Sequence, residues 1–331
     1  MTLQSTVQAG ILFLLSLGAL TMLPVSAFGD DLVGPPAPPP LPDRKNKLDS
    51  SRDYLSDEFV DFVSYVDRFF GSDRNYQDAN DSVMQLDIMR VSGYGGNRSF
   101  VLSARANVHL PIAEKKLHLL LETDPDKNAT VNPRQTLSPP LAQPSSLQSY
   151  AAALRIEEVA AEKWHFNLDG GLKFAGLNTA PFARTGAVLA VPLDLWRARF
   201  SETAYWFNTT GVGETTELDL DRPISEPVSF RSTSVAVWLD RTQYFDMRQD
   251  LTVFHKLDER TALMYQASAF ALSRPNTVVT EYVVLMLYRY RLHREWMFFE
   301  VSPQLHFPRA LNFHNSAMLS LRLEMLFDGT Q

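Results

Sequence analysis

The sequence predicts an all-β protein: a closed antiparallel transmembrane β-barrel of about 14 strands, with about 12 as the next count, preceded by one amphipathic α-helix. Three observations lead to this fold. Apolar and polar residues alternate with a period of two from Val83 to Phe327, which is typical of strands with two different faces. The polar faces are rich in arginine and acidic residues. Aromatic residues gather near the ends of the candidate strands, as they do in the girdles of membrane barrels.

The N-terminal residues carry an export signal. Residues 10–23 are apolar, and Val25, Ser26 and Ala27 fit the small-x-small cleavage rule. We therefore expect residues 1–27 to be a signal peptide. The residues before the apolar run contain no lysine or arginine, so an uncleaved N-terminal anchor is the alternative. Either reading places the rest of the chain outside the cytoplasm.

Two further segments precede the strands. Residues 28–55 include the run GPPAPPPLP, which favours extended polyproline and predicts a periplasmic linker. Residues 56–81 are expected to form an amphipathic helix and its connector, because apolar residues recur there at helical spacing. These apolar residues are Phe59, Phe62, Val63, Val66, Phe69 and Phe70. We expect this face to dock against the barrel. A position on a membrane surface is the alternative, disfavoured by the acidic polar face.

The barrel is expected over residues 82–328. The clearest candidate strands are residues 100–110, 116–122, 164–174, 195–207, 228–239, 251–257, 263–272, 281–292, 297–307 and 317–327, and the weaker ones are 83–91, 149–156, 182–191 and 214–220. The connections after even-numbered strands are short, whereas those after odd-numbered strands include the long segment 124–146. Short turns at one end and longer loops at the other are typical of outer-membrane barrels. No helical pattern is evident between the strands.

The two faces of each strand suggest that lipid lies outside and charge inside. In the last strand Leu321 and Leu323 share an apolar face, while Arg322 and Glu324 share the polar one. A soluble antiparallel sandwich would alternate as well, so a soluble periplasmic β protein stays an alternative. Strands in lipid must close into a ring, because an open edge leaves backbone groups without hydrogen bonds.

Composition excludes several kinds of site. The chain has no cysteine, which rules out disulfides, thiolate metal sites and cysteine nucleophiles. Its net charge of -7 does not suit nucleic-acid binding, which needs a basic surface. No His, Asp or Glu group has the spacing of metal ligands. We therefore expect no metal, no cofactor and no nucleic-acid partner.

The polar faces predict a charge network in the lumen. Its members are Arg105, Glu122, Lys163, Asp169, Arg184, Arg197, Arg199, Arg289, Arg291, Glu300, Arg322 and Glu324. One interpretation is a set of ion pairs that fills the barrel. The other is an electropositive pore or cavity for a small anion, since the planar guanidinium pairs with carboxylate or phosphate.

Histidines on the polar faces leave an enzymatic alternative open. His109, His118, His165 and His306 lie there, with Ser103 and Ser302 nearby in the sequence. A lipid-modifying enzyme built into a barrel would need a serine, a histidine and an orienting acid within reach of one another. The sequence contains no nucleophile-elbow motif, so we expect no catalytic residues.

Three stretches carry a resemblance to a known family. They are the tail LSLRLEMLF, the segment RYRLHREWMFFEVSPQLHFPR and the segment ARANVHLPIAEKKLHLLLETDPD. Together they resemble an uncharacterised family of proteobacterial outer-membrane β-barrel proteins, over most of Asp57 to Gly329. The tail departs from the usual C-terminal signal because DGTQ follows Phe327. The resemblance implies fold and location and brings no activity or catalytic residues.

These observations predict a non-enzymatic outer-membrane protein of a Gram-negative bacterium, either a structural barrel or a narrow channel with an arginine-rich lumen. Its N-terminal segment would be periplasmic. Its expected partners are outer-membrane lipid and the barrel-assembly machinery, which would read the C-terminal strand.

Overall fold

A computed structural model describes residues 69–70, 82–93, 98–109, 117–130, 148–160, 164–193, 195–292 and 296–328. The expected signal peptide and linker lie outside these residues. So does the expected amphipathic helix, apart from Phe69 and Phe70. No helix in the described part of the chain is long and apolar enough to cross a bilayer.

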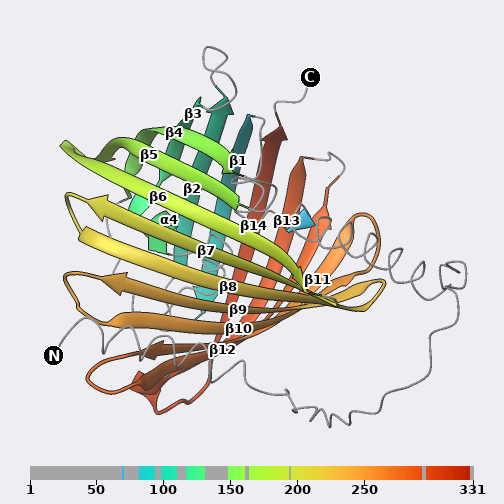
Figure 1. The fold of residues 1–331 in the computed structure, drawn as a ribbon. Coiled ribbons are helices and arrows are strands. Elements are labelled where there is room, and N and C mark those ends of the chain that lie inside the picture. Colours follow the sequence, from blue (N-terminus) through green and yellow to red (C-terminus); the bar gives the residue numbers. More distant parts are fainter. Residues whose placement is uncertain are drawn as a thin grey trace, which may run out of the picture. The chain divides into compact units, whose positions relative to one another are not determined.

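The fold is a closed antiparallel barrel of 14 strands, in which each strand pairs with its neighbours in the sequence and β1 pairs with β14. Figure 1 shows the strands following one another around the wall. The strands are β1 (Val83–Gly93), β2 (Arg98–His109), β3 (Leu117–Thr123), β4 (Tyr150–Ala160), β5 (Trp164–Ala175), β6 (Asn178–Leu193), β7 (Trp196–Phe207), β8 (Gly211–Ser225), β9 (Val228–Leu239), β10 (Phe245–Lys256), β11 (Thr261–Leu272), β12 (Val278–Arg291), β13 (Met297–Pro308) and β14 (Ser316–Asp328). The predicted barrel and its strand number are confirmed.

The closing seam shows how alternation produces two surfaces. Ile88 of β1 lies opposite Leu323 of β14, and Leu323 lies opposite Phe299 of β13. This row points outward. The next row, one residue along, carries Arg322 opposite Glu300, and both side chains are buried inside. Because successive strand residues point to opposite faces, one register fixes the placement of the whole row.

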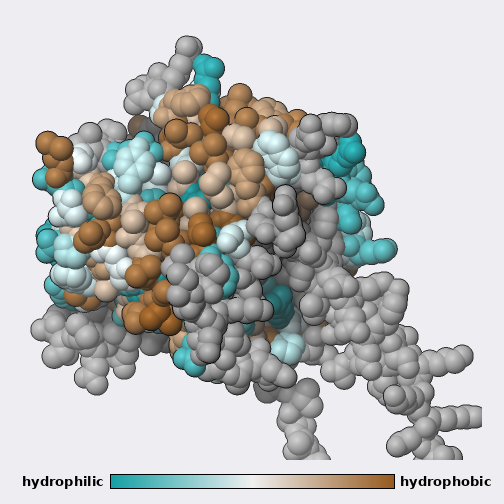
Figure 2. Space-filling view, turned by 90° about the horizontal axis from the view of Figure 1, so that it is seen from above, coloured by the Kyte–Doolittle hydropathy of each residue, from teal (hydrophilic) through white to brown (hydrophobic). Residues whose placement is uncertain are grey.

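Large apolar side chains cover much of the outer wall. Phe100 is 71% exposed, and Leu168 of β5 and Leu154 of β4 are about half exposed. Figure 2 shows hydrophobic residues gathered over the middle of the face in view, with hydrophilic residues at its left and right margins. An apolar wall of this extent is unusual for a protein surrounded by water, and its band matches the lipid-facing belt of membrane barrels.

The connections differ from the expectation in one respect, the presence of a helix. A short helix, α4 (Pro125–Thr130), follows β3. The connection between β5 and β6 is only Gly176 and Leu177, because both strands extend further than the alternation predicted. Gly176 has φ +62°, a conformation that glycine adopts without strain. This connection, which follows an odd-numbered strand, is therefore short.

Candidate functional site in the barrel lumen

The predicted charged residues that the structure describes all lie on inward faces. These residues are Arg105, Glu122, Asp169, Arg184, Arg197, Arg199, Arg289, Arg291, Glu300, Arg322 and Glu324. Lys163 lies outside the described residues. The structure divides most of the eleven between two clusters, which we call the β3–β6 cluster and the seam cluster.

The β3–β6 cluster is centred on Asp169 of β5, which is fully buried. Arg155 of β4 donates two hydrogen bonds to its carboxylate, from Nε to Oδ1 at 2.7 Å and from Nη2 to Oδ2 at 3.0 Å. Arg184 of β6 donates a third from Nε, at 2.7 Å. Arg184 also lies 3.3 Å from Glu122 of β3. Two arginines thus share the Asp169 carboxylate, and Arg155 binds it through two nitrogen atoms at once.

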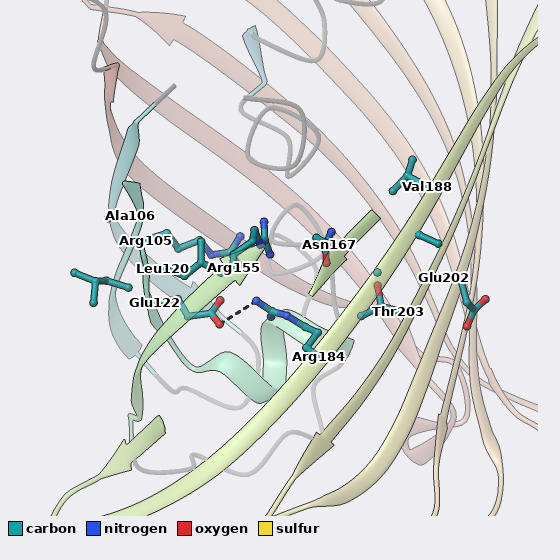
Figure 3. Close-up of a pocket in the computed structure, with 13 residues that line it drawn as sticks. Arg105, Ala106, Leu120, Glu122, Arg155, Asn167, Arg184, Val188, Glu202 and Thr203 are labelled. Carbon is teal, nitrogen blue, oxygen red and sulfur yellow. Dashed lines mark ion pairs between the residues drawn. The ribbon is translucent and has the colours of Figure 1, made fainter. Parts of the chain in front are cut away.

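A small cavity of ≈ 90 Å³ adjoins this cluster. Figure 3 shows Arg105, Arg155 and Asn167 on its lining, together with the Glu122–Arg184 ion pair. Space is left in part because β6 has Gly186 opposite Asn167. A Cβ at Gly186 would lie 2.8 Å from Oδ1 of Asn167. The cavity is large enough for a few waters or a small hydrophilic solute, and its lining offers mainly hydrogen-bond donors.

The seam cluster holds β12, β13, β14 and β1 together. Nη1 of Arg289 donates to Glu300 and, at 2.7 Å, to Glu324. Arg322 donates to Glu300 at 3.4 Å and lies 3.2 Å from Glu324. Its Nη2 also donates to Asp87 of β1 at 2.8 Å. This last bond crosses the closing seam, so the cluster ties the first strand to the last.

Acidic residues outside the predicted network lie beside the remaining arginines. Asp219 and Glu217 flank Arg199, at 3.8 and 3.6 Å. Asp221 accepts a hydrogen bond from Arg231, and Asp250 accepts one from Arg248 at 2.7 Å. Arg197 lies opposite Asp221 in the register, and Arg291 donates to the backbone oxygen of Glu259. The lumen therefore contains arginine and acid in alternation. The sequence analysis missed these acids, although their strand parity marks them as inward-facing.

Apolar side chains narrow the lumen at the end where β1 begins and β14 ends, which we call the terminal end. Phe69 and Phe70 pack there with a cluster on the inner wall, formed by Phe254, Ala262, Met264, Leu285, Leu287 and Phe298. The ring centroids of Phe69 and Phe298 are 5.7 Å apart, and those of Phe70 and Phe254 are 5.2 Å apart. The Arg289 guanidinium lies 4.0 Å from the Phe298 ring centroid, within the range of a cation–π contact. For these two residues, the contact expected of the phenylalanine face is present.

Helix α4 narrows the lumen at the opposite end, which we call the loop end. Ala129 is buried with Leu120, Ala151, Ala153, Phe182, Tyr205 and Phe207, and its carbonyl accepts a hydrogen bond from Thr215 Oγ1 of β8 at 2.9 Å. Lys173 of β5 pairs with Asp126. Figure 1 shows α4 within the ring of strands. A sequence signal for it existed, because Asp124, Pro125 and Asp126 match the preferences of a first helical turn.

The histidines do not form a hydrolytic triad. His306 Nδ1 lies 2.6 Å from Glu281 Oε1, as an orienting acid would require. Its Nε2, however, lies 3.0 Å from the amide oxygen of Gln304, not from a serine. Ser302 instead bonds to the Gln304 amide nitrogen at 3.3 Å. Without contact between serine and histidine, the serine has no base to activate it.

The other predicted histidine positions are dispersed along the first five strands. His109 of β2 lies opposite His118 of β3, with ring centroids 5.3 Å apart. His165 lies on the inward face of β5, and Ser103 bonds to Asp87 at 3.4 Å. Across the described part of the chain, no group of three or more His, Asp or Glu side chains could hold a metal ion.

Comparisons with known proteins yield fold likenesses only. No protein-family model matches the chain, and no curated protein matches it. Among solved structures it is similar to OprB of Pseudomonas putida, with a TM-score of 0.46, 8% identity, and coverage of 78% of this chain and 97% of that one. It is also similar to the outer membrane channel DcaP of Acinetobacter baumannii (0.42, 8%, 75% and 96%) and to the KdgM porin (0.36, 6%, 73% and 99%).

Proposed function

We propose that this chain is a non-enzymatic barrel of the Gram-negative outer membrane that forms a narrow channel for small hydrophilic solutes. The observation that supports this most is the reversal of polarity across the wall. Large apolar side chains point outward, while buried ion pairs and a polar cavity lie inside. A water-soluble barrel would bury apolar residues inside and expose polar ones, so the reversed arrangement suits lipid as the surrounding solvent.

The fold supports a location in the outer membrane. Strands can cross a bilayer only as a closed ring, since every backbone group must then find its partner within the sheet. The 14 strands close without a gap at the β1–β14 seam. An even number of strands also brings both ends of the barrel to the same side. That side would be the periplasm, where the N-terminal segment and the barrel-assembly machinery that reads β14 would meet it.

The lumen supports a narrow channel more than an open pore. Phe69 and Phe70 occupy the terminal end and α4 occupies the loop end. Between them the described cavity beside Arg105 and Arg155 is small. A solute of a few heavy atoms suits this space, and the arginine-rich lining would favour a small anion. A structural barrel without transport is the second candidate, favoured by the same two obstructions.

Conductance separates the two candidates. The purified full-length protein would be reconstituted into planar bilayers and compared with a Phe69→Ala/Phe70→Ala variant and with a variant in which a Gly-Ser linker replaces residues 125–130. A channel predicts small unitary steps in the unaltered protein and larger steps in both variants. No conductance in any of the three would exclude the channel. A phospholipase assay on the same samples should detect no activity above an empty-vesicle control.

A further inference from the structure

We propose that the outer wall at β6–β8 is an interface with a second copy of this chain. The surface consists of Ala187, Glu202, Ala204, Trp206, Glu214 and Thr216, which we call the outer polar patch. Glu202 lies on β7 three residues after the inward-facing Arg199, so strand alternation places it on the outside. The register puts Glu202 beside Thr216 of β8 and Ala187 of β6.

The outer polar patch interrupts a mostly apolar belt. Glu202 is the seventh of twelve residues in β7, which places it near the middle of the strand. The equivalent outward positions elsewhere carry Leu168 on β5, Val284 on β12 and Leu321 on β14. A carboxyl group at this depth in hydrocarbon is costly unless its oxygen atoms are hydrogen-bonded. A lipid-only environment therefore does not explain the choice of residue.

The chain does not satisfy this carboxyl group completely. Oε1 of Glu202 is buried and has no hydrogen-bond partner within the described residues. The next polar pair along the wall differs, because Gln249 Nε2 donates to Ser232 Oγ at 2.9 Å and so is satisfied within the chain. Buried polar groups in folded proteins nearly always have a partner. Oε1 of Glu202 thus leaves one hydrogen-bond acceptor on the outer wall for a partner outside this chain.

A second copy fits the outer polar patch in both shape and hydrogen bonding. Ala187 and Ala204 flank Glu202; Ala204 is exposed and Ala187 is half-buried. Small residues of this kind let two membrane-embedded backbones approach closely. The patch carries acceptors on Glu202 and Glu214 and a donor on the Trp206 indole. Across a two-fold axis every contact occurs twice, so a surface that holds both donors and acceptors can complement itself.

Disulfide cross-linking in native membranes tests the proposal, because the chain has no cysteine of its own. Ala204→Cys places a thiol in the outer polar patch, and Leu319→Cys places one on the lipid-facing side of β14. Mild oxidation of the full-length protein should convert the Ala204→Cys variant to a species of twice the monomer mass and leave Leu319→Cys monomeric. Equal cross-linking of both variants, no cross-linking at Ala204→Cys, or a product with a different protein would each overturn it.

A second substitution links the interface to Glu202. Adding Glu202→Leu to the Ala204→Cys chain should lower the dimer yield several-fold while the barrel keeps its heat-modifiable gel migration. An unchanged yield would mean that the Glu202 carboxyl group faces no partner copy and would overturn the proposal. The result is independent of the proposed channel, because cross-linking does not require conductance and a non-conducting barrel could still form the dimer.

Discussion

Removing the Asp169 carboxylate should be among the most destabilising changes available in the lumen. Asp169 is fully buried and accepts three hydrogen bonds of 2.7–3.0 Å from Arg155 and Arg184. Charged hydrogen bonds contribute about 1.5–3 kcal/mol each, but bonds in one cluster are not additive. Breaking a buried pair, which leaves the other charge uncompensated, costs about 3–5 kcal/mol. We expect Asp169→Ala to lower the free energy of unfolding by roughly that amount.

Urea unfolding of the barrel refolded into lipid vesicles measures this change, with the shift from heat-modifiable gel migration as the readout. Asp258→Ala is the control, because that carboxylate lies in the exposed β10–β11 turn. There the backbone amide of Arg260 lowers the pKa of Asp258 by donating a hydrogen bond to it. Asp169→Leu combined with Arg155→Met and Arg184→Met should recover part of the loss, since it removes all three charges together. The recovery should be incomplete, because Glu122 and Glu157 each lose an arginine partner. An Asp169→Ala effect under about 1 kcal/mol would refute the reasoning.

Three further predictions concern the wall and the lumen. Leu321→Arg should make the free energy of folding into lipid less favourable by roughly 2–4 kcal/mol. Arg322→Leu should still assemble and should lose stability only because the acidic partners of Arg322 are left without it. The yield of membrane-inserted protein after refolding measures both effects. Gly171→Ala should cost about 1–3 kcal/mol, because its Cβ would lie 2.6 Å from the Ala153 Cβ. Gly170→Ala, with nothing within 4 Å, should be neutral in the same urea assay. Replacing residues 125–130 with a Gly-Ser linker should leave the barrel folded, as judged by heat-modifiable migration, since α4 contributes no strand.

Alternation was sufficient to predict the wall of this protein. Successive residues of a strand face lipid and lumen in turn, so apolar and polar residues alternate with a period of two. This pattern can be read within each strand, without knowledge of its distant partners. The prediction was therefore correct even for weak segments such as residues 214–220, which lie within β8. Helix α4 was missed for the opposite reason. Its six residues are too few for a helical period, and it is held by distant partners such as Thr215.

The charge network was predictable in composition but not in pairing. Strand parity placed Arg322 inside, but its partner Asp87 is 235 residues away, and only closure of the ring brings them together. The same limit applies to the acids on β8, which counterbalance Arg199. An inventory weighted toward arginine suggested an electropositive lumen. Whether the paired lumen keeps any anion preference stays a prediction, to be read from the reversal potential in a salt gradient.

Fluorescence quenching along β14 tests the central claim, that this wall faces lipid on one side and a polar lumen on the other. Single cysteines at positions 319 to 323 of the otherwise cysteine-free chain would each carry a small fluorophore in the barrel refolded into vesicles. A quencher dissolved in the lipid should act strongly on labels at 319, 321 and 323 and weakly on those at 320 and 322. Equal quenching at all five positions, or at none, would contradict a transmembrane barrel and favour a soluble β protein.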